Sequence, residues 1–194
     1  MKRTESLPEG YREIFSVDLQ QDKKVAVGIN VAAALVGIAL AVGMHFLVPI
    51  TALFSMERGL GPYLLRFGVL LVAYVAYIVL HEAVHGIAMK LCGTKKVRFG
   101  FTGLYAFAGS DDYYGKKSYI FIALAPVVLW GVVLGVLCLL LPREWFWVAW
   151  LVQVTNLSGA AGDIYVTCKF ARMPADILVR DCGVGMTVFS AAEL

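Results

Sequence analysis

The sequence predicts an all-α integral membrane bundle of about four transmembrane helices, with a small cytosolic-side β-hairpin between the second and third spans. Of its 194 residues, 60% are hydrophobic and 16% are charged, whereas about a quarter of a soluble domain is charged. The mean hydropathy is +0.76. Apolar runs long enough to cross a bilayer also follow one another along the chain. The net charge of +3 comes from the flanks of these runs, so we expect no nucleic-acid partner.

Four spans are expected, at residues 25–49, 63–91, 119–141 and 145–170, and together they make a membrane domain at 25–170. The polar segment 1–24 begins with no apolar signal core, so we expect it to be cytosolic, with an interfacial helix around 11–19. The tail 171–194 can hold a short helix and a final strand. Lys and Arg gather in both terminal segments and in the loop before the third span, which predicts a multi-pass cell-membrane protein with both termini in the cytosol.

A β-hairpin is expected at about 95–115, between the second and third spans. The residues there alternate and are rich in aromatic and β-branched side chains, and Thr102-Gly103 is a candidate turn. Phe99 and Phe101 then fall on the same side of one strand. We expect them to contact a substrate beside the site described next. In the third span, Pro126 is expected to mark a kink.

The second span contains the sequence His81-Glu82-Ala-Val-His85. On a helix the two histidines lie one turn apart on one face, where both can bind a single zinc ion. Glu82 is then close enough to handle the proton of a zinc-bound water, whose pKa zinc lowers toward about 7. The chain has three histidines, and two of them have this spacing within an apolar run, where ionisable groups are costly. The pattern predicts a zinc site.

A catalytic zinc site needs a third protein ligand and an open position. Asp163 is the candidate, because it precedes the basic end of the fourth span by about as many residues as His85 precedes the end of the second span. The two side chains should therefore lie at similar depth. Asn156 lies on nearly the same face as Asp163, where we expect it to bind a substrate backbone.

Other roles stay open for these and neighbouring residues. Asp163 can cap a helix or pair with Lys169, Asn156 can join helices by hydrogen bonds, and Tyr74 and Tyr77 can either orient the histidines or pack. His45 is expected to be an interfacial or hydrogen-bonded histidine near the opposite face. The less favoured candidate ligands are Asp111, Asp112, Cys92 and Cys168.

With these residues in place, the region 63–170 resembles the core of site-2 proteases, which are intramembrane zinc metalloproteases. Those proteins carry His-Glu-x-x-His on their first core helix and an Asn followed by Leu-Asp-Gly on the third. The stretch from Asn156 to Asp163 departs from that pattern, since it lacks the prolines and has Gly162 and Ile164 around the aspartate. The chain also resembles a family of small bacterial and archaeal membrane proteins described as "putative zincin peptidases".

The sequence and these resemblances together predict a zinc-dependent membrane-embedded endopeptidase. Zinc would be held by His81, His85 and Asp163, and Glu82 would act as the general base. The substrate would be a membrane protein or peptide, bound in or near the bilayer. The alternative is a membrane zinc protein without catalytic activity: a sensor, a transport subunit or an inactive protease homologue. The motif glutamate distinguishes them, because a pure binding site needs no base beside the metal.

Overall fold

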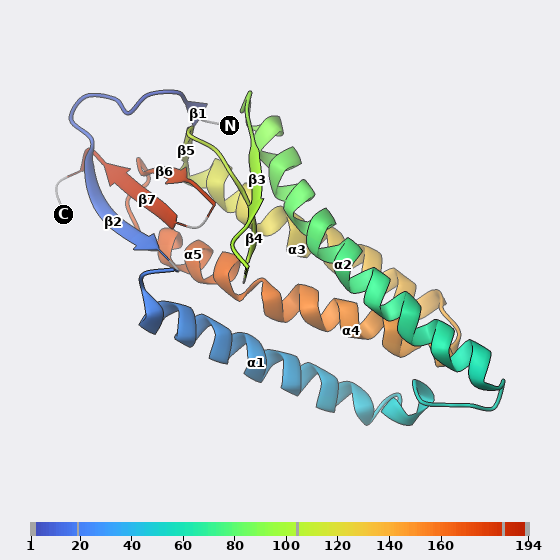
Figure 1. The fold of residues 1–194 in the computed structure, drawn as a ribbon. Helices are drawn as coiled ribbons and strands as arrows, with labels where there is room; N and C mark the ends of the chain where they lie inside the picture. The colour runs from blue at the N-terminus through green and yellow to red at the C-terminus, as the bar shows by residue number, and fades with distance from the viewer. Residues whose placement is uncertain (1–2, 19, 104, 184, 193–194) are drawn as a thin grey trace. The chain divides into compact units, whose positions relative to one another are not determined.

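The computed structural model describes residues 3–18, 20–103, 105–183 and 185–192. The chain divides into two compact units, one made of residues 1–29, 82–126 and 162–194 and the other of residues 30–81 and 127–161. The helices are α1 (Lys23–His45), α2 (Leu60–Leu91), α3 (Lys116–Leu140), α4 (Arg143–Gly159) and α5 (Ala161–Ala171), with a short 3₁₀ helix at Ile50–Ala52 (Figure 1). Within the described residues, three helices are long and apolar enough to cross a membrane: α1, α2 and α3.

The expected fourth span is not one helix. Helix α4 has 17 residues and ends at Gly159, and α5 begins at Ala161. Between them Ala160 has a ψ angle of 8°, outside the helical range. Two glycines flank this point, and glycine is among the weakest helix formers. The prediction of a continuous helix over 145–170 was therefore wrong.

The expectation of an all-α bundle was also wrong, because the first unit contains a five-stranded antiparallel sheet. Its strand order is β1-β5-β6-β7-β2. The strands are β1 (Arg3–Thr4), β2 (Arg12–Asp18), β5 (Tyr113–Gly115), β6 (Leu178–Asp181) and β7 (Gly185–Ser190). The fold is mixed α/β. In Figure 1 the strands drawn from the two terminal segments, β2 and β7, lie side by side.

The sheet forms because helices of the same unit cover one of its faces. Tyr114, Val179 and Val188 on the strands are fully buried, and they share a core with Met89 of α2 and Phe170 of α5. Residues 11–18 of the expected interfacial helix are mostly strand β2, which pairs with β7 near the other end of the sequence, and residue 19 lies outside the described residues. Such a distant partner cannot be found from local periodicity.

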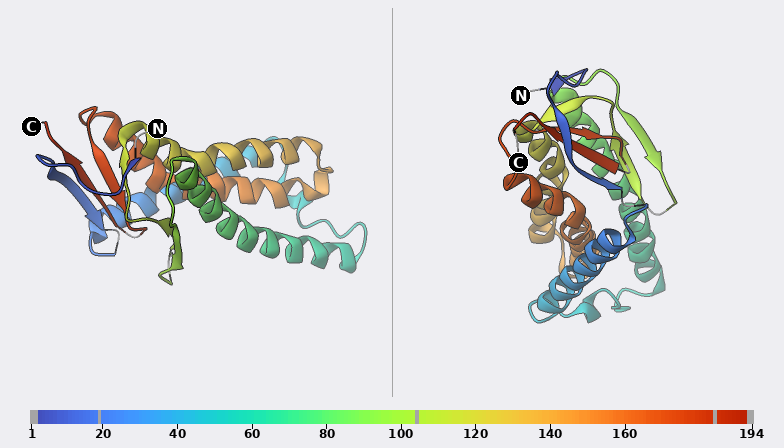
Figure 2. Two further views of the ribbon diagram at one scale, coloured as in Figure 1. Left: turned by 90° about the horizontal axis from the view of Figure 1, so that it is seen from above. Right: turned by 90° about the vertical axis from the view of Figure 1, so that its left-hand side faces the viewer.

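The expected hairpin is present as a separate two-stranded sheet. Strand β3 (Arg98–Phe101) pairs antiparallel with β4 (Ala106–Gly109), and the Thr102 N–H donates to the Tyr105 carbonyl at 2.9 Å across the turn. The third strand of this region, β5, belongs to the larger sheet. Both views of Figure 2 show the hairpin projecting away from the strands of that sheet.

In the second unit, α4 contacts segments of α1, α2 and α3. The Gln153 side chain donates to the Gly131 carbonyl of α3 at 3.1 Å, and the Tyr74 hydroxyl of α2 donates to the Leu151 carbonyl at 3.3 Å. Gly37 of α1 lies opposite Ser158 of α4, where an added Cβ would meet the serine Oγ at 3.5 Å. These contacts hold apolar helices together through buried polar groups and close approach.

Candidate metal centre

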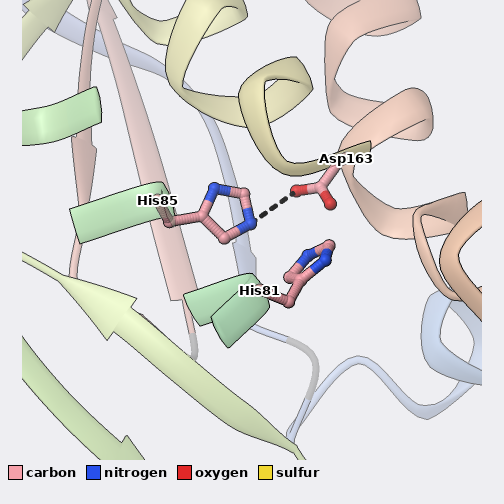
Figure 3. A group of neighbouring side chains, drawn as sticks. All are labelled: His81, His85 and Asp163. Atoms are coloured by element: carbon pink, nitrogen blue, oxygen red, sulfur yellow. Dashed lines mark ion pairs between the residues drawn. The ribbon is translucent and has the colours of Figure 1, made fainter. Parts of the chain in front are cut away.

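Three side chains that the sequence predicts as zinc ligands lie together: His81 and His85 of α2, and Asp163 of α5. One possible ligand atom from each lies within 4.8 Å of those of the other two. Figure 3 shows both imidazole rings and the carboxylate directed toward a common point. All three residues are half-buried, and no other group of this kind occurs among the described residues.

His85 is oriented by the main chain of α3. Its Nδ1 lies 2.9 Å from the carbonyl oxygen of Ile122. Because a carbonyl oxygen can only accept, Nδ1 must carry the proton. The opposite nitrogen, Nε2, faces Asp163 at 3.8 Å from Oδ1 (Figure 3). A neutral imidazole protonated on Nδ1 has its lone pair on Nε2, and the neutral form of histidine is the one that binds a metal.

His81 is oriented by a chain of side chains. Its Nδ1 lies 2.8 Å from the Tyr77 hydroxyl, which donates to Oδ1 of Asn156 at 3.0 Å. The Asn156 amide nitrogen donates to the Val127 carbonyl at 3.2 Å, which fixes the orientation of the amide. Since the tyrosine proton points to Asn156, the tyrosine oxygen accepts from Nδ1–H of His81. In its neutral form this imidazole therefore also has its lone pair on Nε2.

Asn156 itself is fully buried, and its amide is engaged by Tyr77, Val127 and Gln153. The sequence favoured a substrate-binding role for Asn156, with hydrogen bonding between helices as the alternative. Its contacts match the alternative. Tyr77, which was expected either to orient a histidine or to pack, contacts His81 directly.

Asp163 lies in the first turn of α5, immediately after the break from α4. The N-terminal end of a helix favours a negative charge, so a carboxylate is stabilised there. The sequence placed Asp163 within the fourth span at the depth of the histidines, and the break gives it a first-turn position in place of a mid-helix one. Lys169, the cation considered as its partner, lies instead over the ring of Phe15 at 4.3 Å.

The less favoured ligand candidates have other roles. Asp111 binds Arg98 of β3 at 2.7 Å and Arg180 of β6 at 3.0 Å, and these bonds hold the pKa of its carboxyl below the usual value. Asp112 binds Arg3 at 2.8 Å. His45 accepts a hydrogen bond from the Ile50 N–H at 3.1 Å, as expected of a hydrogen-bonded histidine. Cys92 is buried and Cys168 is exposed, and neither joins the metal group.

The hairpin contacts α2 next to the second histidine. A Cβ built on Gly86 would lie 2.4 Å from Cζ of Phe99, so an alanine at this position would force the phenylalanine ring to shift. Phe99 and Phe101 are nevertheless 59% and 70% exposed. Asp111, by binding Arg98 and Arg180, ties the hairpin to the larger sheet.

Asp181 was not identified from the sequence, because it lies in the tail to which no role was assigned. Its carboxylate accepts hydrogen bonds from the Tyr119 hydroxyl and, at 2.7 Å, from the Gly183 N–H. Burial raises the pKa of this carboxyl, whereas the hydrogen bonds from Tyr119 and Gly183 lower it. Asp181 is thus a buried acidic group held by Tyr119 and Gly183.

Comparison with known proteins agrees with this chemistry. Residues 74–178, more than half of the chain, match the family described as "Putative zincin peptidase". A protein of Pyrococcus woesei described as "Uncharacterized 24.7 kDa protein in gap 5'region" is 25% identical over 122 residues, which cover 60% of this chain and 53% of that protein. The chain therefore spans about half the length of this curated relative. No solved structure matches this chain. The matched segment contains both histidines, Glu82 and Asp163, and the chain belongs to the "Putative zincin peptidase" family.

Proposed function

We propose that this chain is a zinc-dependent, membrane-embedded endopeptidase. The observation that supports it most is the geometry of His81, His85 and Asp163, whose possible ligand atoms lie within 4.8 Å of one another. Two imidazole nitrogens and a carboxylate oxygen form a donor set typical of catalytic zinc, which keeps a further position open. With Nδ1 of each histidine engaged by another group, Nε2 is the nitrogen that each neutral imidazole would offer to zinc, so the residues present fit zinc.

Within this site Glu82 is the proposed general base. When bound, zinc would act as a Lewis acid that polarises the scissile carbonyl and acidifies water. Glu82 is half-buried and follows His81 directly on α2. It would accept the proton of the attacking water and then deliver it to the leaving amine, which are the two proton transfers that peptide hydrolysis requires.

The β3–β4 hairpin has a strand edge that suits the binding of an extended substrate. Among the described strands, β3 pairs only with β4, so its other edge is available to a further strand. Phe99 and Phe101 are exposed on this strand, and Phe99 also reaches Gly86, one residue after a metal ligand. A substrate segment added to β3 would gain main-chain hydrogen bonds there and contacts with both rings. We infer that Phe99 and Phe101 bind the substrate.

The sheet also bears on the membrane topology. It joins strands from before α1, from between α2 and α3, and from after α5. We infer that these segments lie on one side of a bilayer, which requires an even number of crossings between β2 and β7. With α1, α2 and α3 as crossings, α4 and α5 together would make the fourth. The excess of Lys and Arg in these segments supports the cytosol as that side.

Cysteine labelling in intact cells tests the topology. Single cysteines are placed at positions 57 and 113 in a chain whose own exposed cysteines have been replaced, and an impermeant reagent is added outside. We expect labelling at 57, in the loop before α2, and none at 113 on β5. Labelling at 113 would move the sheet and the site to the outer face.

The enzymatic proposal is tested by Glu82→Gln. The amide is nearly the same size but cannot accept the proton, so cleavage of apolar peptides in detergent micelles should fall by about 10²–10⁴. Zinc content, measured by mass spectrometry of the same samples, should stay at the wild-type level. If wild type binds zinc and the variant cleaves equally well, the mechanism is wrong, and a non-catalytic zinc protein becomes the better account.

A further inference from the structure

Pro126 lies within the continuous helix α3 and is fully buried. In an α-helix each carbonyl accepts from the N–H of the residue four positions later. Proline has no N–H and cannot donate this bond. The residue four positions before Pro126 is Ile122, so the Ile122 carbonyl lacks the donor that a helix would otherwise supply. The sequence had suggested only a kink at this point.

The Ile122 carbonyl is also the group that contacts the second metal histidine. Nδ1 of His85 lies 2.9 Å from its oxygen, within the usual range for a hydrogen bond. Ile122 is 2% exposed, so water has little access to this oxygen. A carbonyl released by a proline and a ring nitrogen that needs an acceptor thus meet in one buried place.

We propose that Pro126 is a positioning residue for the metal centre. By withholding an N–H from α3, it reserves the Ile122 carbonyl for His85 and holds that imidazole with the proton on Nδ1. Nε2 is thereby presented to the metal. The proposal rests on the zinc function proposed above. Partners of this kind orient metal-binding histidines and raise their basicity, and their loss typically weakens metal binding about 10–100-fold.

A purely structural role for Pro126 and the positioning role proposed here predict different effects of Pro126→Ala. Proline in a helix interior weakens the helix, so Pro126→Ala should leave the metal-free protein as stable as wild type or more so. The backbone N–H that this substitution introduces would compete with His85 for the Ile122 carbonyl. Removing the proline should therefore improve the helix while damaging the metal site.

The experiment compares the full-length wild type, Pro126→Ala and Gly135→Ala in detergent. Gly135 lies on the same helix, and an added Cβ would meet nothing within 4 Å, so this control also favours the helix without touching His85. Zinc affinity is measured by competition with a chelator, and thermal unfolding is recorded without metal. Pro126→Ala should lose at least about tenfold in zinc affinity with no loss of thermal stability, and Gly135→Ala should bind zinc as wild type does.

Zinc binding by the wild type separates failure of the proposed function from failure of the role of Pro126. If wild type binds no zinc, the proposed function fails; if it binds zinc and Pro126→Ala binds it equally well, the role of Pro126 is overturned. A readout that needs no variant is the ¹⁵N NMR spectrum of the metal-free wild type above the titration range of histidine. The His85 ring should be protonated on Nδ1. Protonation on Nε2 would overturn the inference even if Pro126→Ala fails to fold.

Discussion

The two candidate metal-binding histidines are both engaged at Nδ1 but are held in different ways. His85 contacts a main-chain carbonyl of α3 in one step, whereas His81 depends on two side chains in series, Tyr77 and then Asn156. No side-chain substitution removes a carbonyl, although a new N–H can compete for it. The side-chain series can be cut at either member. The comparison shows that one requirement, a proton on Nδ1, is met once by the backbone and once by side chains.

The residues that orient the two histidines belong to different units of the chain. His85, Ile122 and Pro126 belong to the unit that contains the sheet, while Tyr77, His81 and Asn156 belong to the unit of apolar helices. Each histidine is thus oriented from within its own unit. Substitutions that act on one histidine should leave the partners of the other in place, and this separation can be tested.

The largest effect on both histidines is expected from their shared neighbour. Asp163→Ala removes the carboxylate that faces Nε2 of His85, so zinc affinity should fall by more than the roughly 10–100-fold typical of outer partners. Asp163→Asn should also weaken binding, because a neutral amide is a poorer ligand. Asp111→Ala is the control, since Asp111 binds arginines. If the metal content fell in Asp111→Ala and persisted in Asp163→Ala, Asp111 and not Asp163 would be the third ligand.

A smaller effect is expected from cutting the side-chain series. Tyr77→Phe removes the acceptor of His81 Nδ1 while keeping the ring, and zinc affinity should fall about tenfold. Tyr74→Phe is a matched control. Tyr74 lies one turn before Tyr77 on α2, and its hydroxyl donates to the Leu151 carbonyl. Chelator competition measures both variants. Equal affinities in the two would show that the series does not orient His81.

The smallest effect on zinc, and a large one on cleavage, is expected at the hairpin. The Phe99→Ala/Phe101→Ala double variant should keep zinc and expression but lose peptide cleavage. Gly86→Ala should act similarly by displacing the Phe99 ring, and adding Phe99→Ala should relieve that clash. Gly68→Ala, where an added Cβ meets nothing within 4 Å, is the helical control. An unfolded double variant would make the hairpin a packing element.

The candidate ligands could be predicted from the sequence because their signals are local. Two histidines at a helical spacing define one face of α2, and the basic residues at the ends of apolar runs give the approximate depth of Asp163. The break between α4 and α5 changes the environment of Asp163 from mid-helix to first turn. Gly159 and Gly162 are the signal in the sequence for this break, because glycine is a weak helix former.

The sheet and the orienting partners could not be predicted in the same way. Strand β2 finds β7 only after the chain has passed through every helix, and strands of four to seven residues in polar terminal segments leave weak periodicity. Asn156 is 79 residues from Tyr77, and Ile122 is 37 from His85. Residue type alone does not show that a proline on one helix releases a carbonyl for a histidine on another.

The most direct test of the central claim is X-ray absorption at the zinc edge of the purified, zinc-loaded protein. We expect two imidazole nitrogens and further oxygen ligands, all at about 2.0–2.2 Å, with no sulfur. His81→Ala and His85→Ala should each remove imidazole scattering or abolish zinc binding. A sulfur ligand at about 2.3 Å, or full zinc occupancy that survives loss of both histidines, would contradict it.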